Sequence, residues 1–248
     1  MEIIRSYSRD EIIGPSYWKI SDFGVAQFRH NYNPELLKKI ASKAMELKSD
    51  LANNRHLDLN YIRGVQRYIP EVQSFLEDKE RLAKLEQLVG VPLEVYTISV
   101  ITSIVTFMGS EDGTISWHTD GPPLVEIIPL DIDNLEGGET QVYCNNHEIG
   151  RLELEENKEL PHNKIISVEH KMGFSLLGQF YRVLHRASPI YNGSRMTLNI
   201  GYRSRNKPYI DDNSLVYLGA DNPDFEWLDQ YYDDVKQNKL PAYLKHQN

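Results

Sequence analysis

His118, Asp120 and His185 are residues of the right type and spacing to hold one metal ion. Side chains alternate along an extended segment, so His118 and Asp120, two positions apart, project from the same face. His185 ends the apolar stretch 174–184, which predicts a strand that delivers it to a fixed point. Two imidazoles and one carboxylate on one side of an ion leave other positions open, which predicts a redox-active Fe(II) site.

A second pair of residues, Arg195 and Thr197, follows ten positions after His185. A planar guanidinium grips a carboxylate through two parallel hydrogen bonds, which a lysine cannot reproduce. The whole order, His118-x-Asp120, then His185 and then Arg195-x-Thr197, resembles the Fe(II)/2-oxoglutarate-dependent dioxygenase superfamily. In that family the arginine binds the far carboxylate of 2-oxoglutarate, and a Ser or Thr two residues later adds a hydrogen bond.

The resemblance covers about residues 95–205 and includes Gly137-Gly138-Glu139-Thr140, which is similar to the family's glycine turn into a strand. It implies Fe(II), 2-oxoglutarate and O2 as cofactors, with ascorbate as a reductant in vitro. It also implies hydroxylation of an unactivated C–H bond with release of succinate and CO2. The related halogenases carry Gly or Ala in place of Asp120, so the carboxylate here favours hydroxylation.

The substrate expectation comes from size and layout, which resemble the compact bacterial hydroxylases of free amino acids, sisters of the carrier-independent halogenases. We therefore expect a small polar metabolite, a free amino acid, as substrate. Arg63, Arg67, Ser103 and Gly121 are the pocket candidates. Either arginine could bind a substrate carboxylate or lie on the surface as a solvated charge.

Three alternatives remain open at this point. The same chemistry could act on a peptidyl side chain or a lipid-like acid. A degenerate barrel could bind partners without metal or catalysis. A zinc hydrolase could use two histidines and one aspartate, although this reading leaves Arg195 and Thr197 without a role.

The composition fits an intracellular enzyme. The 248 residues, 40% of them hydrophobic, can bury one core, so we expect a single domain over 1–248. No apolar stretch could span a bilayer and no secretory segment begins the chain, which predicts a cytoplasmic protein without membrane contact. Cys144 is the single cysteine, which excludes a disulfide framework. A net charge of −9 argues against nucleic acid as a ligand. The oligomeric state is open, with a homodimer as one possibility.

The surrounding pattern predicts an α+β, mainly β protein. It has a double-stranded β-helix core (jelly-roll or cupin-like) at about 94–205, with supporting N-terminal helices and a short C-terminal helix. Asn33-Pro34-Glu35 begins one helix and Pro70 begins another that runs to about Leu88. The C-terminal segment 221–236 predicts a helix that docks on the barrel, with a lid or dimer contact as its functional alternative. Strands are expected at 94–107, 124–130, 139–143, 149–154, 164–170, 174–181 and 196–203. The docking side chains are expected to be Phe225, Leu228 and Tyr232, and the histidines expected in solvent are His147, His162 and His170.

Overall fold

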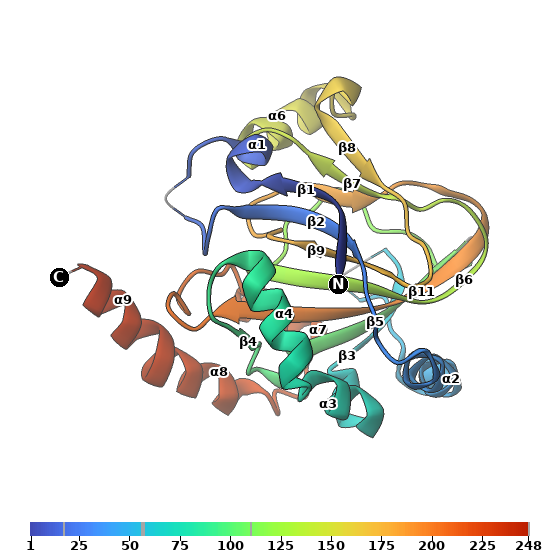
Figure 1. Cartoon of the computed structure of the whole chain (residues 1–248), viewed down its shortest axis with the longest axis horizontal. Coiled ribbons are helices and arrows are strands. Elements are labelled where there is room, and N and C mark those ends of the chain that lie inside the picture. Colours follow the sequence, from blue (N-terminus) through green and yellow to red (C-terminus); the bar gives the residue numbers. More distant parts are fainter. Residues whose placement is uncertain (17, 56–57, 110, 248) are drawn as a thin grey trace.

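The framework of the protein is a large antiparallel sheet faced by a small one. The computed structural model describes residues 1–16, 18–55, 58–109 and 111–247. Within these, an eight-stranded sheet runs β1-β2-β9-β6-β11-β5-β3, with β4 also paired to β11, and a three-stranded sheet runs β10-β7-β8. Figure 1 shows the small sheet, with β7 and β8, stacked above the large one. The strands are β1 (Glu2–Ser8), β2 (Phe23–Arg29), β3 (Asn60–Arg63), β4 (Leu93–Val95), β5 (Ser103–Gly109), β6 (Leu124–Gly137), β7 (Thr140–Tyr143), β8 (Ile165–Val168), β9 (Phe174–Gly178), β10 (His185–Ala187) and β11 (Ile190–Ser204).

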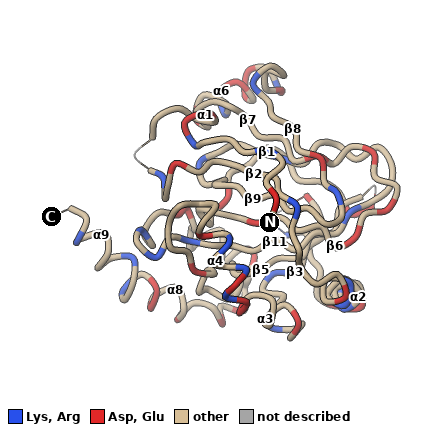
Figure 2. Tube along the Cα trace, viewed as in Figure 1, with Lys and Arg blue, Asp and Glu red and all other residues tan. Residues whose placement is uncertain are grey.

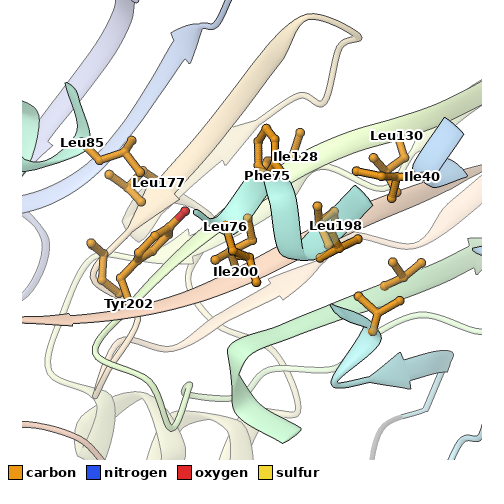
Figure 3. Close-up of a cluster of buried hydrophobic side chains, with 14 of the residues drawn as sticks. Ile40, Phe75, Leu76, Leu85, Ile128, Leu130, Leu177, Leu198, Ile200 and Tyr202 are labelled. Atoms are coloured by element: carbon orange, nitrogen blue, oxygen red, sulfur yellow. The ribbon is translucent and has the colours of Figure 1, made fainter. Parts of the chain in front are cut away.

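Three helices cover the outer face of the large sheet: α2 (Pro34–Leu51), α3 (Pro70–Leu76) and α4 (Lys79–Val89). The start of α2 was predicted correctly, because the Asn33 side chain accepts hydrogen bonds from the first free amides and Pro34 occupies the first turn. Figure 3 shows Leu198, Ile200 and Tyr202 of β11 beside side chains of α3. This outer core holds the large sheet in place.

The helix expected from Pro70 to Leu88 is two helices. The first ends at Leu76, and Asp78 then caps the second by accepting hydrogen bonds from the amides of Glu80 and Arg81. An aspartate at this position competes for backbone amides and favours a new helix start over continuation of the old one. The apolar spacing continues across the break, so the pattern alone did not reveal it.

The inner face of the large sheet meets the small sheet. Along β6, Leu124, Ile128 and Leu130 belong to the outer core, while Val125 and Ile127 lie in the inner cluster. A strand buried on both faces reads as a continuous apolar run, which is why 124–130 was recognised as strand. The same alternation puts alternate residues of β11 inside the barrel.

Several strand predictions were wrong. Residues 149–154 lie in helix α6 (His147–Asn157), where Ile149 and Leu152 are exposed. Their apolar side chains mimicked a strand without being buried. The stretch before His185 is not one strand, because β9 ends at Gly178 and the chain turns through Arg182 at a φ of 52° before β10 begins. The barrel also recruits β1, β2 and β3 from outside 94–205.

The C-terminal region is more helical than predicted. Helices α7 (Leu215–Asp221), α8 (Leu228–Asp234) and α9 (Leu240–Gln247) are present, with a π-helical turn at Val235–Lys239 between the last two. In Figure 1, α8 and α9 continue as a rod that projects from the body. Trp227 is fully buried among residues of the Tyr96–Ile101 segment, with Leu228 packed against them. Phe225 and Tyr232 are more than half exposed, so the predicted docking face was wrong in two of its three residues.

Short helices complete the chain, and charged residues of both signs are spread along it. Figure 2 shows Lys and Arg positions interspersed with Asp and Glu along the trace. Among the described residues, no helix is both long and apolar enough to cross a bilayer. The short helices are α1 (Arg9–Ile13), α5 (Ser99–Thr102) and the 3-10 turns Val65–Arg67 and His162–Lys164.

Candidate metal centre

The structure brings His118, Asp120 and His185 together. Their potential ligand atoms all lie within 4.8 Å of one another. The Asp120 carboxylate lies 3.5 Å from Nε2 of His118 and 3.6 Å from Nε2 of His185. The backbones of the two histidines are paired by reciprocal N–H to C=O hydrogen bonds of 2.9 Å. Strand β10 therefore begins at a candidate metal ligand, His185, whose backbone is held in register with the His118-x-Asp120 segment.

Backbone carbonyls orient both imidazole rings. Nδ1 of His118 lies 2.8 Å from the carbonyl oxygen of Ser116, and Nδ1 of His185 lies 3.0 Å from that of Val183. Each Nδ1–H donates to its carbonyl, so each Nε2 presents a lone pair toward the Asp120 carboxylate. Phe180 stacks on the His185 ring at 4.2 Å between centroids. The chain itself thus holds the two imidazole rings in place.

Electrostatics keep His185 and Asp120 in the forms that bind metal near neutral pH. Burial, together with the neighbouring His118, lowers the pKa of His185 to about 4. Burial alone would raise the pKa of Asp120, but His185, His118 and Arg63 outweigh it, and the pKa is lowered. A neutral imidazole and an ionised carboxylate are the forms that bind a divalent metal. Two nitrogen donors and one oxygen donor from one side match the set that binds non-haem Fe(II).

Arg195 and Thr197 project into the same interior from β11. Arg195 is 5% exposed, and its Nη2 lies 3.2 Å from Sδ of Met108. Its Nε and Nη1 have no hydrogen-bond partner within the described residues. Burial lowers the pKa of Arg195 to about 10, which still leaves it a cation at neutral pH. A buried guanidinium with unpaired donors lacks its anion, and a carboxylate is the group that fits it.

The Thr197 hydroxyl is part of a chain of side chains. It lies 2.7 Å from Oγ1 of Thr106 on β5 and 3.0 Å from Oδ1 of Asn199. These positions are cross-strand or alternate neighbours on the inner face of the sheet. Their hydroxyls supply hydrogen-bonding capacity beside the Arg195 guanidinium.

Of the substrate candidates, Arg63 lies close enough to the metal ligands for its charge to act on Asp120. Its Nε donates to the buried carboxylate of Asp221, which also accepts from the hydroxyl of Tyr61. The terminal nitrogens of Arg63 make no hydrogen bond within the described residues. Asp221 thus fixes the Arg63 guanidinium, and the charge of this guanidinium acts on Asp120.

The other three candidates lie elsewhere or act through backbone. Arg67 is at the surface, where its guanidinium lies 5.3 Å from the Tyr68 ring and 3.9 Å from Glu226. Ser103 is buried on the face of β5 that packs against the helices, and it donates to Gln66. The carbonyl of Gly121, one residue after the candidate ligand Asp120, accepts a hydrogen bond from the amide of Asp212. A side chain at 121 would collide with Asn213.

Sequence reasoning missed Thr106, Asp221 and His170. Thr106 alternates with Ile104 and Met108 on β5, a signal that became usable once its strand partner was known. His170 was expected in solvent, but its Nε2 lies 2.8 Å from the hydroxyl of Thr140. Burial and then the Arg195 charge hold its pKa well below the ordinary value. Asp221 carried no local signal, because its partners are about 160 positions away in the chain.

Several solved structures have a similar fold. The chain is similar to the non-haem α-ketoglutarate-dependent epimerase SnoN from nogalamycin biosynthesis, at 15% identity and a TM-score of 0.55, covering 73% of this chain and 78% of that one. It is also similar to HygX from Streptomyces hygroscopicus, solved with nickel and 2-oxoglutarate, at 15% identity and a TM-score of 0.54, covering 73% of this chain and 83% of that one. A Pseudomonas putida prolyl-4-hydroxylase is similar at 13% identity and a TM-score of 0.51, covering 73% of this chain and 93% of that one.

At this level of identity, the likeness shows the fold. No protein-family model and no curated protein matches the sequence. The chain has the jelly-roll fold of the 2-oxoglutarate and iron oxygenases, so the fold expected from the sequence resemblance is confirmed. Within that fold, the His-Asp-His cluster and Arg195 are features of this chain's own geometry.

Proposed function

We propose that this protein is an Fe(II)- and 2-oxoglutarate-dependent oxygenase that hydroxylates a C–H bond of a small polar metabolite. The observation that carries the proposal is the pairing of a His-Asp-His cluster with a buried arginine whose Nε and Nη1 are unpaired. A metal cluster alone would suit a hydrolase, and a buried arginine alone would suit many anions. Together in a jelly roll of this type they fit one metal and one dicarboxylate.

The residues divide the work. His118, Asp120 and His185 would hold Fe(II), while Arg195 and Thr197 would hold the far carboxylate of 2-oxoglutarate. When bound, this pair supplies the oxidising power of O2: 2-oxoglutarate, O2 and a C–H bond give succinate, CO2 and a C–OH bond. The chain fixes the position of each reactant, and the apolar inner cluster around Val125, Val142 and Leu176 excludes water from behind the site. Asp120 supplies a carboxylate ligand, which favours hydroxylation over halogenation.

Arg63 supports an anionic group on the substrate. Its Nε is bound to Asp221, so the guanidinium is fixed, and its positive charge acts on Asp120. A substrate carboxylate gripped there would lie close to the metal. We therefore propose a free amino acid as substrate, with Arg63 and not the surface residue Arg67 as the carboxylate anchor.

The first experiment measures succinate from purified protein with Fe(II), 2-oxoglutarate, ascorbate and air, against a panel of free amino acids and related metabolites. Stimulation by one compound, lost in His118→Ala, is the expected result. An Arg63→Leu variant should raise the KM for that compound while an Arg67→Leu variant leaves it unchanged.

Other outcomes separate the alternatives. Under anaerobic conditions, Fe(II) and 2-oxoglutarate should give a visible absorption band with the protein. A band without turnover on the panel would direct the search to peptidyl or lipid-like substrates. Absence of both the band and succinate would overturn the proposal in favour of a non-catalytic barrel, and metal-dependent hydrolysis with zinc would favour a hydrolase.

A further inference from the structure

His170 is a partly buried histidine outside the metal cluster, and it interacts electrostatically with Arg195. His170 follows β8, where Ile166 and Val168 pack into the inner cluster. Two positions beyond Val168, the same alternation carries His170 toward the interior. Its Nε2 lies 2.8 Å from Oγ1 of Thr140.

The hydrogen-bond partner of His170 belongs to the strand that supports the metal site. In β7, Thr140 pairs with Val168 on one side and with Ala187 on the other. Ala187 is two residues after the ligand His185 on β10. The Thr140 and His170 pair is thus fixed to the same small sheet as one metal ligand.

Charge defines the state of the ring. Burial, and then the positive charge of Arg195, hold the pKa of His170 well below its usual range. The imidazole is therefore neutral at physiological pH and has one N–H donor and one acceptor nitrogen. When the Thr140 hydroxyl donates to Nε2, the N–H is on Nδ1 and remains for another partner.

Arg195 is the neighbouring residue whose hydrogen bonds are incomplete. Its Nε and Nη1 are buried without hydrogen bonds in the described part of the chain. A carboxylate placed there has four lone-pair positions, more than one guanidinium edge satisfies. A neutral N–H donor adds a hydrogen bond without placing a second cation beside Arg195.

We propose that His170 is a cosubstrate-binding residue, whose Nδ1–H donates to the carboxylate that Arg195 holds. Thr140 sets the tautomer by donating to Nε2. This inference rests on the proposed function, because the carboxylate is that of 2-oxoglutarate.

The test is calorimetric titration of 2-oxoglutarate into protein loaded with Ni(II), which needs no turnover. His170→Phe keeps a ring and removes both nitrogens, and we expect the Kd to rise about tenfold or more. Ni(II) affinity should stay unchanged. The matched control is His162→Phe, at an exposed histidine just before β8, which should leave both affinities at the wild-type values.

Two further variants separate binding from packing. An Asn side chain places its amide near the position of Nδ1, whereas Gln reaches the position of Nε2. His170→Asn should therefore recover most of the 2-oxoglutarate affinity, and His170→Gln should recover little. Recovery by Gln and not by Asn would overturn the proposal in favour of a structural bond to Thr140.

The two levels of inference fail differently. If the wild-type protein with Ni(II) binds no 2-oxoglutarate, the proposed function fails. If the wild type binds it and His170→Phe binds it equally well, the assignment of His170 alone is overturned. Thr140→Val, which loses the bond that sets the tautomer, gives a second reading with an expected loss of severalfold should His170→Phe not fold.

Discussion

Two buried arginines on one strand, Arg195 and Arg203 of β11, have opposite surroundings. Arg203 is 1% exposed and fully engaged, with Nε 2.6 Å from Glu94 and Nη1 2.5 Å from Asp234. Burial alone would lower the pKa of Arg203, but these hydrogen bonds outweigh it and the pKa is raised. Arg195, eight positions earlier, is 5% exposed, has no acidic hydrogen-bond partner among the described residues and has a lowered pKa.

The difference separates a structural charge from one kept for a ligand. A buried cation without a partner is costly, and a fold tolerates it where an anion arrives from outside. The outer face repeats the structural case at Arg81, whose guanidinium binds Glu126 and Tyr202 and whose pKa is raised. The number of unpartnered guanidinium nitrogens, and not burial, therefore distinguishes Arg195: among the described residues its Nε and Nη1 have no hydrogen-bond partner, against Nη2 alone in Arg81.

Arg203→Leu should cause the largest loss of stability. It leaves Asp234, whose side chain is 1% exposed, without its main cationic partner, and breaking a buried pair costs about 3–5 kcal/mol. The measurement is denaturant unfolding of metal-free protein, with Arg203→Lys as the charge-conserving control. A loss below about 1 kcal/mol would remove the contrast between the two arginines.

Arg195→Leu should leave stability unchanged or raise it, because it removes a buried charge that has no partner in the metal-free protein. The affinity for 2-oxoglutarate should fall about 100-fold, close to 3 kcal/mol, through loss of a paired contact to its carboxylate. Calorimetry on the Ni(II)-loaded protein measures the affinity, and unfolding measures the stability. A stability loss like that of Arg203→Leu, with affinity intact, would make Arg195 a structural residue.

The candidate ligand-binding residues could be predicted from the sequence, because they lie at short, regular spacings along the chain. His118-x-Asp120 needs only strand alternation, and Arg195-x-Thr197 lies on one strand. The helix at Pro34 was equally local, since its cap and first turn are adjacent in sequence. Features whose physics spans a few residues were therefore predicted.

The buried ion pairs that stabilise the fold could not be predicted from the sequence. Asp234 and Glu94 meet Arg203 from distant segments, and Asp221 meets Arg63 from the C-terminal region. Helix α6 was taken for a strand because exposed apolar residues carry no sign of their exposure. His170 was placed in solvent for the complementary reason, that a polar segment can still turn one side chain inward. The exposure of α6 and the burial of His170 both depend on tertiary packing, which local sequence patterns do not reveal.

Metal-free protein should lose stability as the pH falls below about 6.5. The pKa of His185 is about 4 in the folded chain and about 6.5 when unfolded, so the unfolded chain binds the proton first. Stability from this group is complete above pH 6.5 and is lost on acidification toward pH 4, with a loss of about 2 kcal/mol by pH 5. Unfolding at pH 7 and pH 5 measures it. His185→Gln should flatten the slope, whereas the exposed-site control His162→Gln should not; equal slopes in wild type and His185→Gln would contradict the lowered pKa.

Thr106→Val should have the smallest effect on 2-oxoglutarate affinity, and it tests whether β5 contributes to the ligand site. Its hydroxyl lies 2.7 Å from that of Thr197, so its loss removes a partner of a residue proposed to touch 2-oxoglutarate without removing that residue. We expect the Kd for 2-oxoglutarate to rise about two- to fivefold, against about tenfold for Thr197→Val, since a lost neutral hydrogen bond is worth about 1 kcal/mol. Thr106→Ser, which keeps the hydroxyl, should match the wild type. If Thr106→Val weakens binding as much as Thr197→Val does, β5 contributes to the 2-oxoglutarate site as much as β11 does. The ligand-binding residues would then be set apart by the inner face of the sheet, and not by their position along β11.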